Sequence, residues 1–298
     1  TAAIVKIDWV SSKLLKSFTF SQKWMKNLDR LRYFPTFMLA LIFLALLSGC
    51  DVFTSRTVAQ MYEEHPEICN DLNSDAWCRA EKADIIKYRF EYLEEMPEIA
   101  LYDLLIMFES YKVCIDKAAQ IRHIKLREKE AGRMKGALTA QRELQRLSRA
   151  TRDSNNPYLS YYQWSRHGHE DALKRFLAHQ RAGRLDTPAL QVGLATYYAK
   201  IDNGRAINAL YTALSMYTDD DIVDPEIFIS LYTLHQDREE TERAVLWGYV
   251  GTEYEDIEVD VAQLTAIASE AGLNIDDIQQ EARRLHNRIE TGDFTFSG

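Results

Sequence analysis

The sequence predicts an all-α protein in which an N-terminal helical hairpin or bundle is followed by an α-solenoid of short paired helices. Past residue 55, every extended segment spaces its apolar residues at intervals of three and four, and no segment longer than a few residues alternates. Glycine and proline fall almost wholly between these segments. Because this spacing is typical of amphipathic helices separated by turns, we expect the chain to be essentially all helical.

Residues 1–49 are expected to be a non-mature N-terminal extension followed by a lipoprotein signal peptide. An uncharged run, residues 34–49, ends in Leu47-Ser48-Gly49-Cys50, and a short basic segment precedes it with Lys26, Arg30 and Arg32. Its apolar part, residues 37–47, is too short to cross a bilayer and ends in small residues. We therefore expect cleavage before Cys50 rather than an uncleaved signal anchor. Met25 is the expected translation start, which makes residues 1–24 an upstream extension.

Cys50 is the expected lipidation site, with residues 50–55 as an acylated tether. Each methylene group buried in the bilayer would contribute about 0.8 kcal/mol of membrane affinity. The mature chain is then expected in the cell envelope, facing the periplasm and held to a bacterial membrane by its acyl groups. Asp51 resembles the signal with which enteric bacteria retain lipoproteins, so it favours the inner membrane over the outer membrane.

Charge narrows the choice of partners. Removing residues 1–49 takes seven Lys/Arg and two acidic residues from totals of 36 and 45, which leaves 29 against 43 and a net charge near −14. This balance argues against nucleic acid, which requires clustered cations, and against general adhesion to anionic lipid headgroups. Residues 117–149 are a local exception, with ten Lys/Arg and three Glu. They are interpreted as a solvated helix face, with a docking surface for an acidic partner or the nearby membrane as the alternative.

Three cysteines remain besides the one expected to carry lipid. Outside the cytoplasm two of them could oxidise, and Cys69 and Cys78 lie close together across the polar loop 70–75. A bridge between them is the favoured prediction, and it would stabilise the fold by about 2 to 3 kcal/mol. Two alternatives stay open, a bridge from Cys78 to Cys114 across a helical hairpin and no bridge at all.

Residues 56–153 are expected to form the helical hairpin or bundle. Segments 76–95 and 99–120 each carry an apolar stripe, and Met96-Pro97 breaks the pattern between them. A third, more polar helix is expected over about residues 136–149. The polar segment 153–157, which ends in Asn156-Pro157, marks a plausible domain boundary.

Beyond this boundary, residues 157–292 predict short helices in pairs. Three helices begin with a capping residue followed by proline, at Asn156-Pro157, Thr187-Pro188 and Asp224-Pro225. The second helix of each pair carries small residues where stacked helices must approach closely, and these begin at Ala172, Ala206 and Ala244, with separations of 34 and 38 residues. Segments 261–271 and 275–290 are expected to cap the stack, and an irregular helical bundle is the alternative.

This pattern resembles a degenerate tetratricopeptide repeat, which has a period of 34 residues and aromatic residues in its first helix. In this chain the corresponding aromatic residues are Tyr161, Tyr162, Trp164, Tyr197 and Tyr198. A wider resemblance covers nearly the whole mature chain. Its motifs are similar to those of a family of bacterial lipoproteins whose domain has no assigned function: Cys69, Trp77-Cys78, Phe108-Glu109, Tyr111-Lys112, Cys114, Ala118-Ala119-Gln120-Ile121, Tyr161-Tyr162, Trp164-Ser165 and 195–200. The resemblance supports the architecture and implies no catalytic residue.

No motif for catalysis, metal or cofactor binding stands out. The chain has no Gly-x-Ser-x-Gly, phosphate loop, dinucleotide fingerprint or His-Glu-x-x-His motif. His167-Gly168-His169 is interpreted as the end of a helix, with Gly168 at its C-terminal position, and not as a metal site. Asp219-Asp220-Asp221 lacks the glycine and glutamate of a calcium loop. We therefore expect no catalytic residue, no metal site and no small-molecule cofactor.

The favoured function is a non-enzymatic scaffold or adaptor that holds an unidentified envelope protein on its helical-repeat surface. The candidate partner-binding residues project from first helices of the pairs, and they are Tyr161, Gln163, Tyr197, Lys200 and Tyr232. An envelope enzyme acting on the cell wall is one alternative, and it would need two carboxyl groups in one cleft. A self-assembling structural strut is the other.

Overall fold

The computed structural model describes residues 56–122, 126–255 and 257–296, and this part of the chain contains helices and no strand. The predicted all-α fold is therefore confirmed. The N-terminal helices are α2 (Val58–Glu64), the 3-10 helix η1 (Pro66–Ile68), α3 (Arg79–Glu91), α4 (Glu98–Ala119) and α5 (Arg127–Ala150). Four helix pairs follow: α6 (Pro157–His167) and α7 (Glu170–Arg181), α8 (Pro188–Tyr198) and α9 (Asn203–Leu214), α10 (Glu226–Asp237) and α11 (Thr241–Gly251), and α12 (Val261–Glu270) and α13 (Ile275–Glu290).

Helices α3 and α4 form the predicted antiparallel hairpin. Pro97 occupies the N-cap of α4 in an extended conformation, which ends the preceding turn and starts the new helix. The predicted stripe of α4 is buried from Leu104 to Ala118, and Phe108, Tyr111 and Ile115 are fully buried within it. In the preceding segment Ile86 of α3 is buried, whereas Leu93, which follows the end of α3, is 41% exposed.

Helix α5 begins nine residues earlier than the predicted start at Gly136. Its N-terminal half is rich in charged residues, which hide the apolar period in the sequence. The tertiary contacts of this half include a buried ion pair, in which Arg133 is 3% exposed and donates to the Asp75 carboxylate over 2.6 Å. α5 packs against α4 more extensively than α3 does, so the N-terminal unit is a bundle and not a hairpin alone.

The paired helices beyond residue 157 begin largely where proline and capping residues predict. The Asn156 side chain accepts hydrogen bonds from the first turn of α6, and Pro188 opens α8. α10 begins at Glu226 with Pro225 as its N-cap, one residue later than the pattern indicates. The small residues at the predicted positions are buried, and a Cβ atom on Gly248 would lie 2.7 Å from Leu264 of α12.

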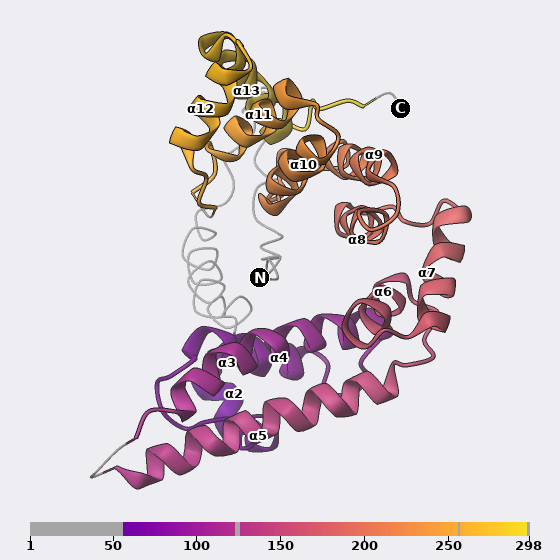
Figure 1. Ribbon diagram of the computed structural model, residues 1–298. Coiled ribbons are helices and arrows are strands. Elements are labelled where there is room, and N and C mark those ends of the chain that lie inside the picture. Colours follow the sequence, from indigo (N-terminus) through magenta and orange to yellow (C-terminus); the bar gives the residue numbers. More distant parts are fainter. Residues whose placement is uncertain (1–55, 123–125, 256, 297–298) are drawn as a thin grey trace, which may run out of the picture.

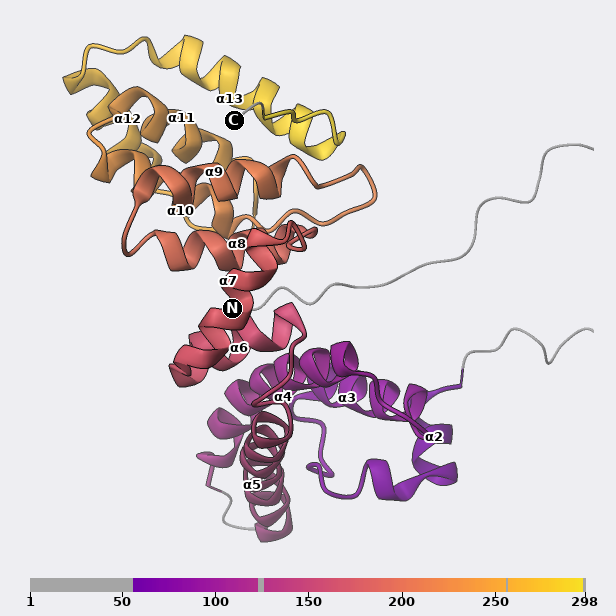
Figure 2. The same ribbon diagram turned by 90° about the vertical axis from the view of Figure 1, so that its right-hand side faces the viewer.

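Two hydrophobic clusters form the core of the described residues, and α6 contributes to both. Leu159 and Tyr162 belong to the N-terminal cluster, whereas Tyr158 and Tyr161 pack against the cluster formed by the later helices. Figure 1 shows the two groups of helices joined at one side through α6 and α7, and Figure 2 shows the same junction from the side. Helix α6 therefore fixes the position of the pairs relative to the bundle.

The predicted signal segment 1–49, lipidation at Cys50, Asp51 and the tether 50–55 lie outside the described residues. Within the part of the chain that the structure covers, no helix combines the length and the apolar character needed to span a membrane.

Candidate interaction surface

Three aromatic residues and a lysine form a continuous surface on the adjacent helices α6 and α8, with the lysine two residues after the end of α8. We call this set the aromatic patch, and its residues are Tyr161, Trp164, Tyr197 and Lys200. The Tyr161 and Trp164 rings lie 6.0 Å apart, and Trp164 meets Tyr197 edge to face at 5.6 Å. The Lys200 ammonium group lies 5.9 Å from the centre of the Trp164 ring. Three half-buried aromatic rings with an exposed cation at their edge are thus presented together.

The Tyr161 ring of the aromatic patch is held in place by close packing. The Tyr161 ring packs 5.4 Å from Phe176 of the next helix and against the backbone of Gly193, where a Cβ atom would lie 3.0 Å from the ring. A larger residue than glycine would push the ring outward. Gly193 therefore lets α6 and α8 approach closely enough for their aromatic residues to join.

Gln163 was predicted to lie on this surface, and that prediction is wrong. Its side chain is fully buried and donates to the Ser148 carbonyl over 2.8 Å and to the Thr151 hydroxyl over 2.9 Å. Because residues two apart on a helix point to nearly opposite sides, Gln163 and Tyr161 cannot share one face. Gln163 ties α6 to the end of α5.

Tyr232 does not join the patch. It is half-buried on α10 and lies 3.3 Å from the position of a Cβ atom on Gly248, so it fills the space between α10 and α11. Trp164, one of the aromatic residues expected in the first helices, connects Tyr161 to Tyr197. Its position three residues after Tyr161, on one helical face, is the sequence signal that places it there.

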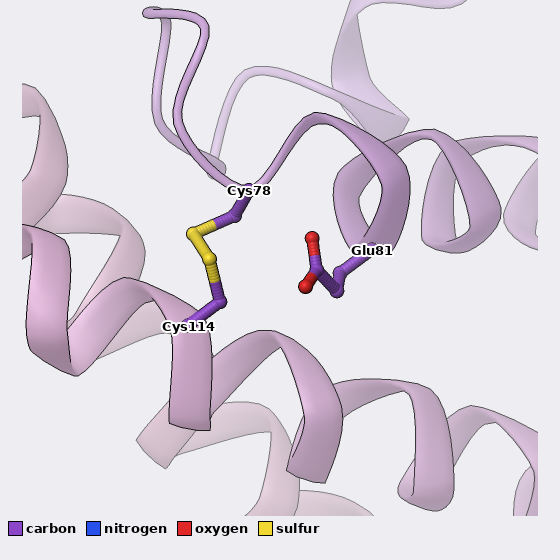
Figure 3. Close-up of side chains that lie close together, drawn as sticks. All are labelled: Cys78, Glu81 and Cys114. Atoms are coloured by element: carbon purple, nitrogen blue, oxygen red, sulfur yellow. A yellow bond between two sulfur atoms is a disulfide. The ribbon is translucent and has the colours of Figure 1, made fainter. Parts of the chain in front are cut away.

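The cysteines pair across the hairpin. The structure joins Cys78 to Cys114 with their Cα atoms 5.8 Å apart, as Figure 3 shows. The favoured prediction of a Cys69–Cys78 bridge is wrong, and the alternative is the one observed. Cys78 occupies the N-cap of α3 with a φ of 55°, and its side chain meets α4, whereas Cys69 is a buried free thiol whose Sγ contacts the His65 carbonyl.

Glu81 lies beside this disulfide. Its carboxylate and the two sulfur atoms all fall within 4.8 Å of one another, and Figure 3 shows the carboxylate next to the bridge. Metal-binding cysteines act as thiolates, and both sulfur atoms here are consumed in a covalent bond. The group therefore offers a cation one carboxylate only.

A pocket of about 380 Å³ opens between α9 and α11. Its apolar and aromatic wall is formed by α9, α11 and the segment after α13, with Ile207, Tyr211, Leu246, Trp247 and Phe296. Its polar residues include Asn208, His235, Arg238, Glu240 and Arg243. This volume is at the small end of ligand sites.

A chain of hydrogen bonds runs along the wall of this pocket. Trp247 Nε1 donates to the Tyr211 oxygen over 3.1 Å, so the phenol proton is directed to His235 Nε2 at 2.9 Å. His235 Nδ1 then donates to the Glu240 carboxylate at 2.7 Å. Every polar atom of the imidazole is satisfied when the ring is neutral.

The directions of the pKa shifts agree with this assignment. Burial lowers the pKa of His235 although the Glu240 carboxylate acts in the opposite direction, and the imidazole is fully buried. The hydrogen bonds from His235 and Arg238 hold the pKa of Glu240 below its usual range, and burial raises the pKa of Tyr211. The phenol is thus not activated as a nucleophile. Glu240 is the one carboxylate among the residues described as lining this pocket.

His167-Gly168-His169 ends helix α6 as expected. Gly168 takes the left-handed conformation at the C-cap with a φ of 70°, and His167 Nε2 lies 2.9 Å from the Ser148 hydroxyl. The two imidazole rings are 5.8 Å apart.

The described residues form an all-α protein in which helix pairs follow an N-terminal bundle. The aromatic patch lies on the first two of these pairs. Residues 47–249 match the family described as Protein of unknown function (DUF2989), and the chain belongs to that family. No curated protein and no solved structure matches the chain.

Proposed function

We propose that this protein is a lipid-anchored lipoprotein of the bacterial cell envelope and acts as a non-enzymatic adaptor that binds an envelope protein through the aromatic patch. The observation that carries the proposal is the continuous contact of Tyr161, Trp164 and Tyr197, with Lys200 at its edge. Rigid aromatic rings that are partly exposed supply large contact area at little entropic cost, which makes them frequent anchors of protein interfaces.

Two further observations support the anchor. The family match begins at residue 47, so it includes Cys50 and the three residues before it. The run that ends at this cysteine has the charge and length of a lipoprotein signal. Tethering at a membrane surface raises the local concentration of an adaptor, so a modest intrinsic affinity is sufficient for binding.

Affinity capture from intact envelopes tests the proposal. We compare the lipidated protein with Lys200→Glu and with the matched control Arg181→Glu, which makes the same charge change at an exposed position of α7. Capture of a specific protein that is lost with Lys200→Glu and retained with Arg181→Glu is the expected result. Equal capture by both variants would contradict the assignment of the patch.

The Cys50→Ser variant tests the anchor separately. It is expected to leave the membrane fraction while it keeps its affinity for the captured partner in solution. Mass spectrometry should show a diacylated or triacylated Cys50 as the first residue of the mature protein, and an unmodified thiol in an uncut chain would contradict the anchor.

A further inference from the structure

Helix α5 exposes one face that carries cations and apolar side chains without an acidic residue. The buried residues Arg133, Gly136, Thr139, Ala140 and Leu147 mark the side that faces the core. At 100° per residue, the positions within about 45° of the opposite direction are 127, 131, 134, 138, 142, 145 and 149. We call this set the α5 outer face, and its residues are Arg127, Ala131, Met134, Leu138, Arg142, Gln145 and Arg149.

Exposure agrees with this geometry. Met134 is 49% exposed and Leu138 is 53% exposed, although both are large apolar side chains. Arg127, Arg142 and Arg149 are exposed around them. Figure 1 places α5 along one edge of the molecule, with the other helices on one side of it, and Figure 2 shows α5 nearly end-on at the same edge.

The acidic residues of α5 point elsewhere. The helix contains seven Lys/Arg and three Glu. Glu143 lies towards the core and pairs with Arg146 and Arg89, and Glu130 pairs with Arg122. Glu128 lies on the flank, about 85° from the centre of the outer face. Residues 157–296 carry 12 Lys/Arg against 24 Asp/Glu, so cations without acids are unusual for this protein.

We propose that the α5 outer face docks on the surface of an anionic phospholipid bilayer. Lysine and arginine residues near such a surface are attracted by its negative potential, and apolar side chains between them enter the headgroup region. A helix of 24 residues is about 36 Å long, and its straight exposed row matches a flat surface. Docking would orient the aromatic patch relative to the membrane.

This inference rests on the proposed function in one respect. A tether of residues 51–55 spans about 18 Å at most, so acylation at Cys50 would hold the bundle that contains α5 next to lipid. The binding of α5 to lipid can nevertheless be measured without acylation.

Flotation with lipid vesicles tests the proposal. The Cys50→Ser chain from residue 50 contains all the described residues. It is mixed with vesicles of phosphatidylcholine alone, or with vesicles that also contain roughly 30 mol% phosphatidylglycerol to represent an anionic leaflet. We expect flotation with the anionic vesicles and not with the neutral ones, and a decrease as salt is raised.

Paired variants locate the surface. Arg142→Gln with Arg149→Gln removes two cations from the outer face, and Arg181→Gln with Arg283→Gln removes two exposed cations elsewhere. Since one cation near the bilayer contributes about a fivefold change in partitioning, the first pair should weaken binding about 25-fold and the control pair by less than about twofold. Leu138→Ser should weaken binding severalfold, and circular dichroism checks that each variant stays helical.

Two results would overturn the inference. One is an absence of binding to anionic vesicles by the unaltered chain, and the other is equal weakening by the two charge pairs. Neither result bears on the adaptor, because capture of a partner is tested with Lys200→Glu on another face.

Discussion

Replacing Cys78 and Cys114 by alanine removes the disulfide that cross-links the start of α3 to α4. The two residues are 36 positions apart, and the loop that the bridge closes restricts the unfolded chain. For a loop of this length, the chain-entropy relation corresponds to about 4 kcal/mol of stability at 25 °C. We expect the double variant to lose this amount in the unfolding transition that includes the N-terminal bundle.

Urea unfolding in a Cys50→Ser background measures the loss, with circular dichroism as the signal. Adding a reductant to the chain with native Cys78 and Cys114 should produce the same loss, and it should have no effect on the double alanine variant. Cys69→Ala serves as the matched control, because it removes a buried thiol without touching the bridge, and it should cost only about 1 kcal/mol.

The reasoning is refuted if the reductant destabilises the double alanine variant as much as the parent chain. It is refuted equally if alkylation and mass spectrometry of the unreduced protein find Cys78 as a free thiol and Cys69 in a bridge.

Three other perturbations follow from the packing. In Gly136→Ala, the new methyl group meets the Tyr111 hydroxyl, which is hydrogen-bonded to Asn73, so the free energy of unfolding should fall by about 2 to 3 kcal/mol; an unchanged urea midpoint would contradict this contact. Arg133→Met leaves the Asp75 carboxylate, whose side chain is 10% exposed, without its ion-pair partner and should cost about 3 kcal/mol, with part of the loss recovered when Asp75→Asn is added. Because burial lowers the pKa of His235, the folded protein binds this proton more weakly than the unfolded chain does. The contribution of His235 to stability should therefore be complete above the unfolded pKa of about 6.5 and decrease as the pH falls below it; an NMR titration that places the imidazole pKa at or above 6.5 would exclude this.

Local sequence chemistry accounts for most helix boundaries. Pro97, Pro157 and Pro188 lie at helix starts, and Gly168 takes the left-handed conformation that ends α6. These positions depend on backbone dihedral preferences and on hydrogen bonds within three or four residues, so the sequence is sufficient to predict them. The start of α5 escaped prediction because the partner of Arg133 is Asp75, which lies 58 residues earlier in the chain.

The candidate site was predictable only in part. Tyr161, Tyr197 and Lys200 lie together because first helices of successive pairs pack side by side, as the repeated small residues indicated. Gln163 and Tyr232 are polar or amphipathic like the residues of the aromatic patch. Gln163 is nevertheless buried against α5, and Tyr232 fills the space between α10 and Gly248 of α11. Residue type alone does not distinguish a free surface from one that a distant helix covers.

By itself, the sequence determined that the described chain is all-helical and where most of its helices break, because both depend on neighbours within a few residues. Tertiary structure alone decided that Cys78 pairs with Cys114, that Gln163 is buried, and that Tyr211, His235 and Glu240 form one hydrogen-bonded chain. These outcomes depend on which helices approach one another in space. That approach is set by the sum of many weak packing contacts between residues far apart in the chain.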